Sequence, residues 1–267
     1  MTYKIRYAYT CHIGKVRDNN EDNFWCCGDS LEAQNQGLNH IESGSKKLHE
    51  VPLYAVFDGM GGENHGEMAA YTATQKCNDY YVNQKSKLKK DPEGFFNELC
   101  EEMNNAVCEY SCMNHAGSMG TTVAAMTFTY DRIVACNLGD SRIYHFDGKS
   151  LCRMSEDHVL RRYFLGKAPL TQYLGMSDSD VILDPSISQS KAEVGDKYLI
   201  CSDGITDMLS ENEIADILSR DVDVTEIVKV LMDRALCSGG RDNMTIVLCE
   251  IIEEKNFFEK MRNWLGV

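Results

Sequence analysis

The sequence predicts an α+β fold in which mainly antiparallel sheets are flanked by helices. Many short strand-like runs follow one another through short turns, while the helix-like segments fall into two blocks. This order favours antiparallel sheets over alternating βαβ units. A length of 267 residues allows one large core. We therefore expect a single domain over 1–267, with its core at about 1–252 and a terminal helix at about 254–267.

The strand-like runs either alternate apolar and polar residues or are continuously apolar, and they are rich in β-branched and aromatic residues. They lie at 3–9, 23–27, 53–57, 121–129, 133–137, 142–146, 181–186, 197–201 and 244–251. The segment 34–47 is rich in Asn, Gly, Ser and His, and it is predicted to be a long loop.

Helical periodicity, with apolar residues recurring every three or four positions, marks four segments. They lie at 66–81, 92–112, 211–218 and 224–236. The segment 254–267 also has an apolar face on a possible helix, formed by Phe257, Phe258, Met261, Trp264 and Leu265. We favour docking of this helix on the body of the domain over docking on a partner.

Composition argues against several classes of protein. With a net charge of −14, the chain has no basic stripe for nucleic acid. No run approaches the ~18 apolar residues of a membrane span, and residues 1–11 lack the apolar centre of a secretory signal. We therefore expect a cytoplasmic protein. The twelve cysteines lie mostly in apolar runs and include no Cys-x-x-Cys pair, which argues against disulfides and zinc.

Two aspartates follow apolar, strand-like runs and precede glycine. Asp58 follows LYAVF and precedes Gly-Met-Gly-Gly, and Asp203 follows YLICS. An Asp-Gly pair after a strand ordinarily forms a hairpin turn, but a helix rather than a strand is predicted after both residues. Both carboxylates are therefore expected at strand ends, facing out of a sheet edge, where functional sites are commonly built.

Three further acidic residues can join this pair. Glu21 and Asp22 close the segment 17–22, and Asp242 lies just before the last predicted strand. Each of them alone could be a solvated turn residue. Carboxylates are hard oxygen donors suited to Mg²⁺ or Mn²⁺. Two unit charges ~4 Å apart at an effective dielectric of ~20 repel by about 4 kcal/mol, so a cluster of these residues would require cations.

Asp140 is ambiguous from local sequence. It lies between the runs IVACNL and RIYHF, and a Gly-Asp turn between two strands favours an ordinary hairpin. The glycine-rich segment 59–62 invites a phosphate-binding interpretation, but it lacks the spacing and the lysine of known phosphate loops. We expect instead that its glycines let the backbone approach a metal closely.

Six short segments, taken in order, make the chain similar to the type 2C family of metal-dependent protein phosphatases. The resemblance runs from about Gly14 to Ile251, and six motifs in the right order are highly specific. The matching segments are Arg17 to Asp22, Val56 to Gly62, Gly117 to Thr122, Gly139 to Arg142, Cys201 to Asp207 and Arg241 to Asn243.

The resemblance implies a four-layer α-β-β-α sandwich with a metal centre in a cleft between the sheet edges. Two or three Mn²⁺ or Mg²⁺ ions are expected there. Asp58 would bridge two metals, and the carbonyl of Gly59 would complete one coordination shell. Asp203 and Asp242 would bind the other metal.

Further roles are implied by the same resemblance. Glu21 and Asp22 would act largely through metal-bound waters, and Asp140 would help to bind a third metal where one is present. Arg17 would hold the substrate phosphate, because a planar guanidinium matches two phosphate oxygens. The implied reaction is hydrolysis of phosphoserine and phosphothreonine by direct attack of a metal-bridging hydroxide, without a phosphoenzyme.

Two departures from the family pattern bear on the chemistry. Met60 stands where some members carry a histidine that is a proposed general acid, so that role is unassigned, and His65, His158 or a metal-bound water are the candidates. The segment 158–174, where members often carry a longer flap, is compact and is expected to contact phosphopeptides. Its basic residues are Arg161, Arg162 and Lys167.

Two other functions remain open, a non-catalytic phosphoprotein-binding regulator on the same fold and a phosphatase of small metabolites. Loss of Asp58, Asp203 or Asp242 would mark the first, and all three are present. The expected partners are phosphorylated proteins, substrates of a serine/threonine kinase. We expect no nucleic-acid partner, no membrane span and a monomeric chain.

Overall fold

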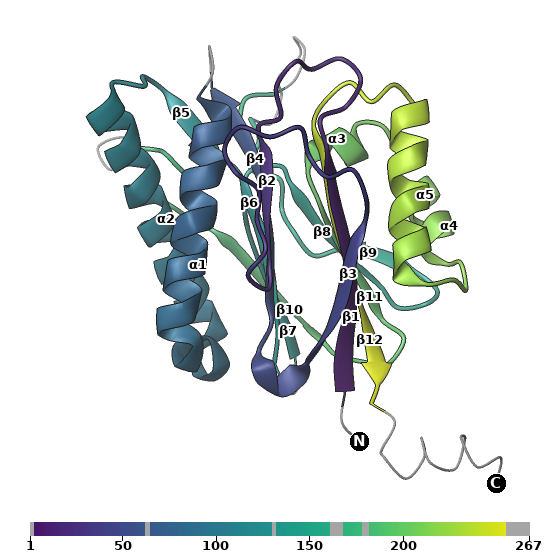
Figure 1. The fold of residues 1–267 in the computed structure, drawn as a ribbon. Helices are drawn as coiled ribbons and strands as arrows, with labels where there is room; N and C mark the ends of the chain where they lie inside the picture. Colours follow the sequence, from purple (N-terminus) through teal and green to yellow (C-terminus); the bar gives the residue numbers. More distant parts are fainter. Residues whose placement is uncertain (1–2, 62–64, 130–131, 161–167, 178–181, 255–267) are drawn as a thin grey trace, which may run out of the picture.

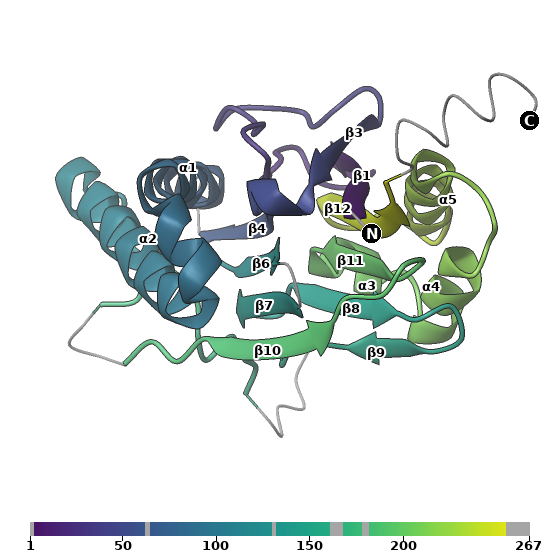
Figure 2. The same ribbon diagram turned by 90° about the horizontal axis from the view of Figure 1, so that it is seen from below.

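The structure is a computed structural model and describes residues 3–61, 65–129, 132–160, 168–177 and 182–254. Within these residues, two antiparallel sheets pack face to face, and helices cover the outer side of each sheet (Figure 1 and Figure 2). The predicted α+β class and the four-layer α-β-β-α sandwich are therefore confirmed. In the part of the chain that is described, no helix is both long enough and apolar enough to cross a membrane.

The first sheet has the strand order β3-β1-β12-β11-β8-β9. Its strands are β1 (Tyr3–His12), β3 (Glu42–Lys47), β8 (Arg142–Phe146), β9 (Leu151–Arg153), β11 (Lys197–Cys201) and β12 (Met244–Glu253). At its centre, β1 pairs with β12 from Tyr3 opposite Glu253 to His12 opposite Met244. The two ends of the described chain therefore lie side by side in one sheet.

The second sheet has the strand order β10-β7-β6-β4-β2, and a short strand, β5, pairs with the far end of β4. Its strands are β2 (Asp22–Cys26), β4 (Leu53–Gly61), β5 (Met119–Thr121), β6 (Val123–Phe128), β7 (Arg132–Leu138) and β10 (Ser186–Lys191). All of its strand pairs are antiparallel.

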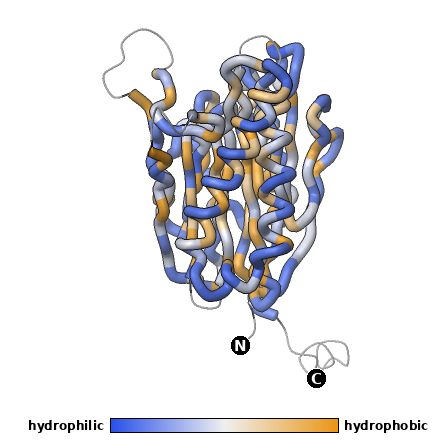
Figure 3. The backbone as a smooth tube through the Cα atoms, turned by 90° about the vertical axis from the view of Figure 1, so that its left-hand side faces the viewer, coloured by the Kyte–Doolittle hydropathy of each residue, from blue (hydrophilic) through white to orange (hydrophobic). Residues whose placement is uncertain are grey.

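Helices cover the outer faces of the two sheets. They are α1 (Gly66–Lys90), α2 (Pro92–Asn114), α3 (Asp203–Thr206), α4 (Glu211–Leu218) and α5 (Val224–Cys237). A short 3-10 helix, η1 (Leu48–Glu50), instead buries Leu48 in the core between the sheets. α1 and α2 pack on the second sheet, and α3, α4 and α5 pack on the first. Figure 3, which looks onto α1 and α2, shows hydrophilic residues along these helices and hydrophobic residues gathered in the strands behind them.

Helix starts follow ordinary capping rules. The Asp91 side chain accepts a hydrogen bond from the amide of Gly94 at the start of α2, where Pro92 is the first residue of the helix. α4 begins with a capping box between Ser210 and Glu213.

The core has three layers, and β4 contributes to two of them because it is buried on both faces. Tyr54 and Val56 face the other sheet, whereas Leu53, Ala55 and Phe57 face α1 and α2. A strand buried on both sides has a continuous apolar sequence rather than an alternating one. The run LYAVF is therefore explained by its place in the middle of the sandwich.

Several element boundaries differ from the predictions, and the predicted strand at 121–129 is divided into β5 and β6. The segment 34–47 contains a strand, β3, whose polar residues pair at the sheet edge and so give no apolar signal. β9 was not predicted, because it is a short and mainly exposed edge strand. β10 lies at Ser186–Lys191 rather than 181–186, and α1 continues to Lys90 although its last turns bury only Leu88.

Candidate metal centre

The site lies at one end of the layer between the two sheets, where the buried side chains change from apolar to polar. Successive residues of a strand point to opposite faces, so every second residue of each inner strand faces this layer. Phe24 and Cys26 of β2 face it, and the same alternation brings Asp22 there. The residues that reach this polar end by the same alternation are Cys11, Asp22, Asp58, Thr122, Ser202 and Thr245.

Three carboxylates meet at this end. Asp58, Asp140 and Asp203 each contribute one carboxylate oxygen, and these three oxygens lie within 4.8 Å of one another. Asp203 is buried, and Asp58 and Asp140 are half-buried. Three negative charges at this spacing, in a partly dehydrated place, repel one another strongly. The arrangement therefore favours a divalent cation among them.

Asp58 lies inside a strand, which corrects the expectation that it would lie at a strand end. β4 continues through Gly61, because Gly59 and Met60 pair with Thr121 and Gly120 of β5. Asp58 also lies opposite Asp22 of the neighbouring strand β2. Its carboxylate is therefore positioned by a sheet and not by a flexible loop.

The turn that carries Asp140 is not a hairpin, so the local interpretation of that turn was wrong. β7, before the turn, belongs to the second sheet, and β8, after it, belongs to the first. The Gly-Asp-Ser turn therefore crosses from one sheet to the other. Thr122 helps to position it, because its Oγ1 lies 2.7 Å from the Ser141 hydroxyl and accepts a hydrogen bond from the amide of Asp58 at 3.1 Å.

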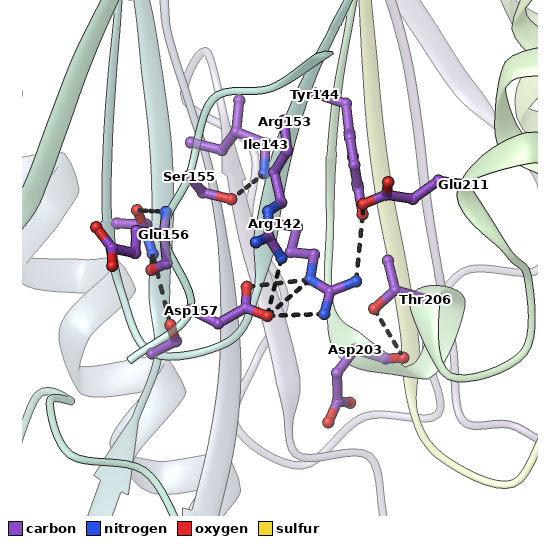
Figure 4. Close-up of polar contacts among 12 residues, drawn as sticks. Arg142, Ile143, Tyr144, Arg153, Ser155, Glu156, Asp157, Asp203, Thr206 and Glu211 are labelled. Atoms are coloured by element: carbon purple, nitrogen blue, oxygen red, sulfur yellow. Dashed lines mark hydrogen bonds and ion pairs between the residues drawn. The ribbon is translucent and has the colours of Figure 1, made fainter. Parts of the chain in front are cut away.

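Asp203 is the first residue of α3, and only Ser202 separates it from the end of β11. Close packing holds this turn, since a Cβ on the next residue, Gly204, would lie 2.0 Å from the carbonyl oxygen of Asn243. Arg142 of β8, opposite Cys201 in the sheet, forms a two-nitrogen ion pair with Asp157 (Figure 4). This ion pair helps to fix the position of β8, the strand that follows the turn with Asp140.

Asp22 is fully buried and has an incomplete set of partners. Its Oδ2 accepts hydrogen bonds from the hydroxyls of Ser202 at 2.7 Å and Thr245 at 2.6 Å. Its Oδ1 is buried and has no hydrogen-bond partner among the described residues. Burial raises the pKa of Asp22, and the nearby carboxylates Asp242 and Glu21 raise it further. A buried carboxylate oxygen without a partner is costly unless a cation or ordered water completes its surroundings.

Asp242 lies outside the trio of carboxylates and pairs with Arg17. Nη2 of Arg17 lies 2.7 Å from Oδ2 of Asp242, and the Arg17 side chain is 52% exposed. Burial raises the pKa of Glu21, and the nearby carboxylates Glu67 and Asp242 raise it further. The negative charge of Asp242 therefore acts on Glu21. Asp242 and Glu21 therefore extend the acidic field of the trio.

Gly59 provides a close backbone approach beside these carboxylates. A Cβ on Gly59 would lie 2.2 Å from the carbonyl oxygen of Gly66 and 2.5 Å from that of Glu21. The amide of Gly59 also donates to the carbonyl of Glu21 at 3.1 Å. No larger residue fits here without moving the backbone.

A cavity of about 300 Å³ opens beside Asp58 and Asp140. Its remaining wall is formed by Met60, Thr122 and the segment 168–170. The basic residues expected to contact phosphopeptides, Arg161, Arg162 and Lys167, lie outside the described residues, as does the predicted terminal helix.

Three positioning residues were not predicted to take part. Ser202 and Thr245 donate to Asp22, as described above. The Asn243 side chain accepts a hydrogen bond from the amide of Glu21 at 2.8 Å and donates to the carbonyls of Ile13 and Asn19. Ser202 and Asn243 are next to the expected metal ligands Asp203 and Asp242 in the sequence, and this position could have indicated that they belong to the site. Nothing in the local sequence distinguishes Thr245.

A two-sheet sandwich with a carboxylate cluster at one end of its inner layer is suited to binding divalent cations. Residues 37–241 match the family model described as Protein phosphatase 2C. This match covers more than half of the chain, so the chain belongs to the protein phosphatase 2C family and is a metal-dependent phosphoprotein phosphatase. The resemblance noted in the sequence is confirmed.

The chain is also similar to individual members of the family. It is 29% identical over 264 residues to the serine/threonine phosphatase stp of Listeria welshimeri, with 94% of this chain and 96% of the relative covered. It is 27% identical over 256 residues to the protein phosphatase PhpP of Streptococcus pneumoniae, with 91% and 96% covered.

Solved structures share the fold. The serine/threonine phosphatase of S. agalactiae has a TM-score of 0.77 at 24% identity, with 93% of this chain and 100% of that chain covered. The catalytic domain of the serine/threonine protein phosphatase PstP, in complex with two manganese ions, has a TM-score of 0.73 at 25% identity, with 94% and 100% covered.

Proposed function

We propose that this chain hydrolyses phosphoserine and phosphothreonine esters in proteins, with two or three Mn²⁺ or Mg²⁺ ions held at the polar end of the inter-sheet layer. The observation that carries the proposal is the trio Asp58, Asp140 and Asp203, whose oxygens lie within 4.8 Å of one another. The names of the relatives, serine/threonine phosphatases, support the substrate class, and the manganese complex of PstP supports the type of metal.

The residues at this end fit divalent cations. The donors are hard carboxylate oxygens, which Mg²⁺ and Mn²⁺ prefer. Among the described residues, the buried Oδ1 of Asp22 has no hydrogen-bond partner. Bound cations would supply the Lewis acidity that activates water for in-line attack and neutralises the phosphate.

The roles of the individual ligands are proposals. We assign Asp58 to bridge two cations, with the Gly59 carbonyl on one of them and Asp203 and Asp242 on the other. Glu21 and Asp22 are assigned to outer positions, where they would act through ordered water. Asp140, which meets Asp58 and Asp203, is assigned together with Asp203 to a third cation.

Arg17 is proposed to hold the substrate phosphate. Its guanidinium is more than half exposed and already directed to the acidic centre through Asp242, so a phosphate could replace that carboxylate as its partner. The general acid remains unassigned. Nδ1 of His158 accepts from the amide of Gly139 at 3.2 Å, and burial lowers the pKa of the ring, which supports a structural role for this histidine.

Several broader expectations also stay predictions. They are a single domain with a docked terminal helix, a monomeric state, a cytoplasmic location and a serine/threonine kinase that generates the substrates. The acidic charge of −14 agrees with a protein that takes up cations at its site rather than one that binds polyanions directly.

The direct test is phosphate release from phosphoserine and phosphothreonine peptides with Mn²⁺, and with Mn²⁺ plus chelator. We expect turnover only with free Mn²⁺. Asp203→Asn should lower kcat by roughly 100-fold or more, because it removes a charged ligand from the centre. Asp216→Asn is the matched control, because Asp216 is an exposed carboxylate on α4.

Three outcomes would contradict the proposal. Equal turnover with and without chelator would remove the metal mechanism. Turnover of small phosphorylated metabolites, but not of any phosphopeptide, would favour the metabolite phosphatase, and binding of phosphopeptides without turnover would favour the non-catalytic regulator. Circular dichroism of Asp203→Asn shows whether a loss of activity reflects chemistry or folding.

A further inference from the structure

A second cavity, of about 650 Å³, opens beside the metal centre at the start of α1. Four segments that are far apart in the sequence form its wall. They include Asn19 before β2, residues 34–36 of the loop after β2, Glu67 and Met68 of α1, and Tyr110 of α2. Among the described residues, it shares no lining residue with the cavity beside Asp58 and Asp140. The two cavities are therefore separate spaces.

Glu21 joins this second cavity to the metal centre. A Cβ on Gly66 would lie 2.6 Å from Oε2 of Glu21, so the start of α1 packs directly against that carboxylate. Burial raises the pKa of Glu21, and the nearby carboxylate of Glu67, which lines the cavity, raises it further. Asn19 is two positions after Arg17, so their Cα atoms are at most about 7 Å apart. A peptide whose phosphate is held by Arg17 is therefore expected to bring neighbouring residues to this cavity.

Hydrogen bonds connect the loop wall of the cavity to the metal centre. Oδ1 of Asn35 accepts a hydrogen bond from Nδ2 of Asn20 at 2.6 Å, and this nitrogen also lies 3.2 Å from Sγ of Cys11. Oγ1 of Thr245 lies 3.2 Å from the same sulfur and 2.6 Å from Oδ2 of Asp22. The loop wall is thus held in position before a peptide arrives, which lowers the entropic cost of binding.

The charges of the lining favour a positively charged occupant. Glu67 is 8% exposed, and Nδ2 of Asn19 donates to its Oε2 at 3.1 Å. A carboxylate accepts up to about four hydrogen bonds, so Glu67 can take further donors. Among the described lining residues there is no lysine or arginine, and His65 is the one base. Glu67 lies in the first turn of α1 and offsets the partial positive charge at the start of that helix.

The rest of the wall fits the shape of a long basic side chain. Met68 and Tyr110 supply apolar surface on which an aliphatic stem can pack. A guanidinium or ammonium group also interacts favourably with an aromatic ring. The side-chain amides of Gln34 and Gln36 supply oxygens that accept hydrogen bonds from its N–H groups. An acidic side chain would instead be repelled by Glu67.

We propose that this cavity is a subsite for an arginine or lysine of the substrate, close in sequence to the phosphorylated residue, and that Glu67 determines the preference. The subsite, which rests on the proposed function, narrows the substrates to phosphoproteins with a basic residue near the phosphate. The metal centre binds the phosphate, and this cavity selects the sequence beside it.

The test uses phosphothreonine peptides that differ only in the position of one arginine among alanines, from four residues before the phosphothreonine to four residues after it. kcat/KM is measured for each peptide with Mn²⁺. We expect arginine at one or two positions to raise kcat/KM by about 10-fold over the all-alanine peptide, as for one charge-assisted hydrogen bond. An equal gain at every position would reflect only the acidic net charge of the chain and would overturn the proposal.

Two variants locate the preference in this cavity. Gln36→Lys adds a positive charge at an exposed position of the wall, and Glu67→Gln removes the negative charge. Both should lower the ratio of kcat/KM for the best arginine peptide to that for the alanine peptide toward one. The ratio is decisive because damage to the metal centre or to the fold lowers both values together. Gln84→Lys is the matched control, because Gln84 is exposed near the other end of α1, and it should keep the parental ratio.

Binding measurements separate this test from that of the proposed function. Fluorescence anisotropy with phosphonate versions of the same two peptides, which are not hydrolysed, gives their dissociation constants for the parent and both variants. If no phosphopeptide is turned over, the proposed function fails, and tighter binding of the arginine peptide that is lost in both variants still supports the subsite. Equal dissociation constants and equal kcat/KM for the two peptides, or a parental ratio in either variant, would overturn it.

Discussion

Nη2 of Arg17 lies 2.7 Å from Oδ2 of Asp242, so the residue expected to hold phosphate is paired with a residue expected to bind metal. The pair joins segments more than 200 positions apart in the chain. An ion pair with such exposed partners is worth at most about 1 kcal/mol. A doubly charged phosphate in the cleft would therefore compete easily with Asp242 for the guanidinium.

Arg17→Lys should impair catalysis without affecting stability. Loss of one charge-assisted hydrogen bond to phosphate, worth about 1.5–3 kcal/mol, predicts a kcat/KM lower by about 10- to 100-fold. Steady-state kinetics with a phosphopeptide measure this loss, and the thermal midpoint should not change. Lys15→Ala is the control, because Lys15 is a neighbouring exposed cation. An unchanged kcat/KM in Arg17→Lys would exclude Arg17 from phosphate binding.

Asp58→Asn should change stability in opposite directions with and without metal. In chelator, the variant should be more stable than the parent, because one of three mutually repelling charges is removed. With Mn²⁺ at ~100 times its dissociation constant, the parent should gain about 2.7 kcal/mol, and the variant should gain much less. Thermal unfolding in the two buffers measures both effects. The same gain in parent and variant would place the metal elsewhere.

Ser202→Ala should destabilise the fold by about 1–3 kcal/mol, because a buried polar group loses its partner. The Ser202 hydroxyl donates to Asp22 at 2.7 Å and accepts from the amide of Thr245 at 2.9 Å. Urea unfolding in chelator measures the change. Ser43→Ala, at an exposed position of β3, should be neutral, and equal effects of the two substitutions would contradict the assigned network.

His12 should make stability depend on pH below neutrality. Nδ1 of His12 accepts from the amide of Gly14 at 2.8 Å, and burial lowers the pKa of the ring. The unfolded chain therefore binds the proton first as pH falls, so this contribution is present above the unfolded pKa of about 6.5 and is lost below it. Urea midpoints between about pH 7.5 and 5.5 should fall less in His12→Asn than in the parent. His49→Asn, at an exposed position, should retain the parental slope.

Local sequence was sufficient where one strand or one helix decides the structure. The strands at 142–146 and 197–201 and the helix at 211–218 were predicted with the observed bounds, because their apolar patterns coincide with their buried faces. β3 and β9 could not be found in this way. They are held by backbone pairing at sheet edges, and their side chains are largely polar or exposed.

Local sequence failed where the question was which sheet a strand joins. Asp140 was assigned to a hairpin because two strands flank it, and the structure places those strands in different sheets. The family pattern had already suggested Asp140 as a metal ligand, and its position beside Asp58 and Asp203 supports that suggestion. Pairing between strands depends on contacts across the whole chain, which a short window of sequence does not contain.

The sequence by itself determined the fold class, the family and the set of acidic residues, because strand alternation, helical periodicity and short motifs are local properties of the chain. Only the tertiary structure decided that Asp58, Asp140 and Asp203 converge and that Asp22 is buried beneath two hydroxyls. The reason is physical. The distance between two side chains from different strands is set by sheet pairing and by the packing of one sheet on the other.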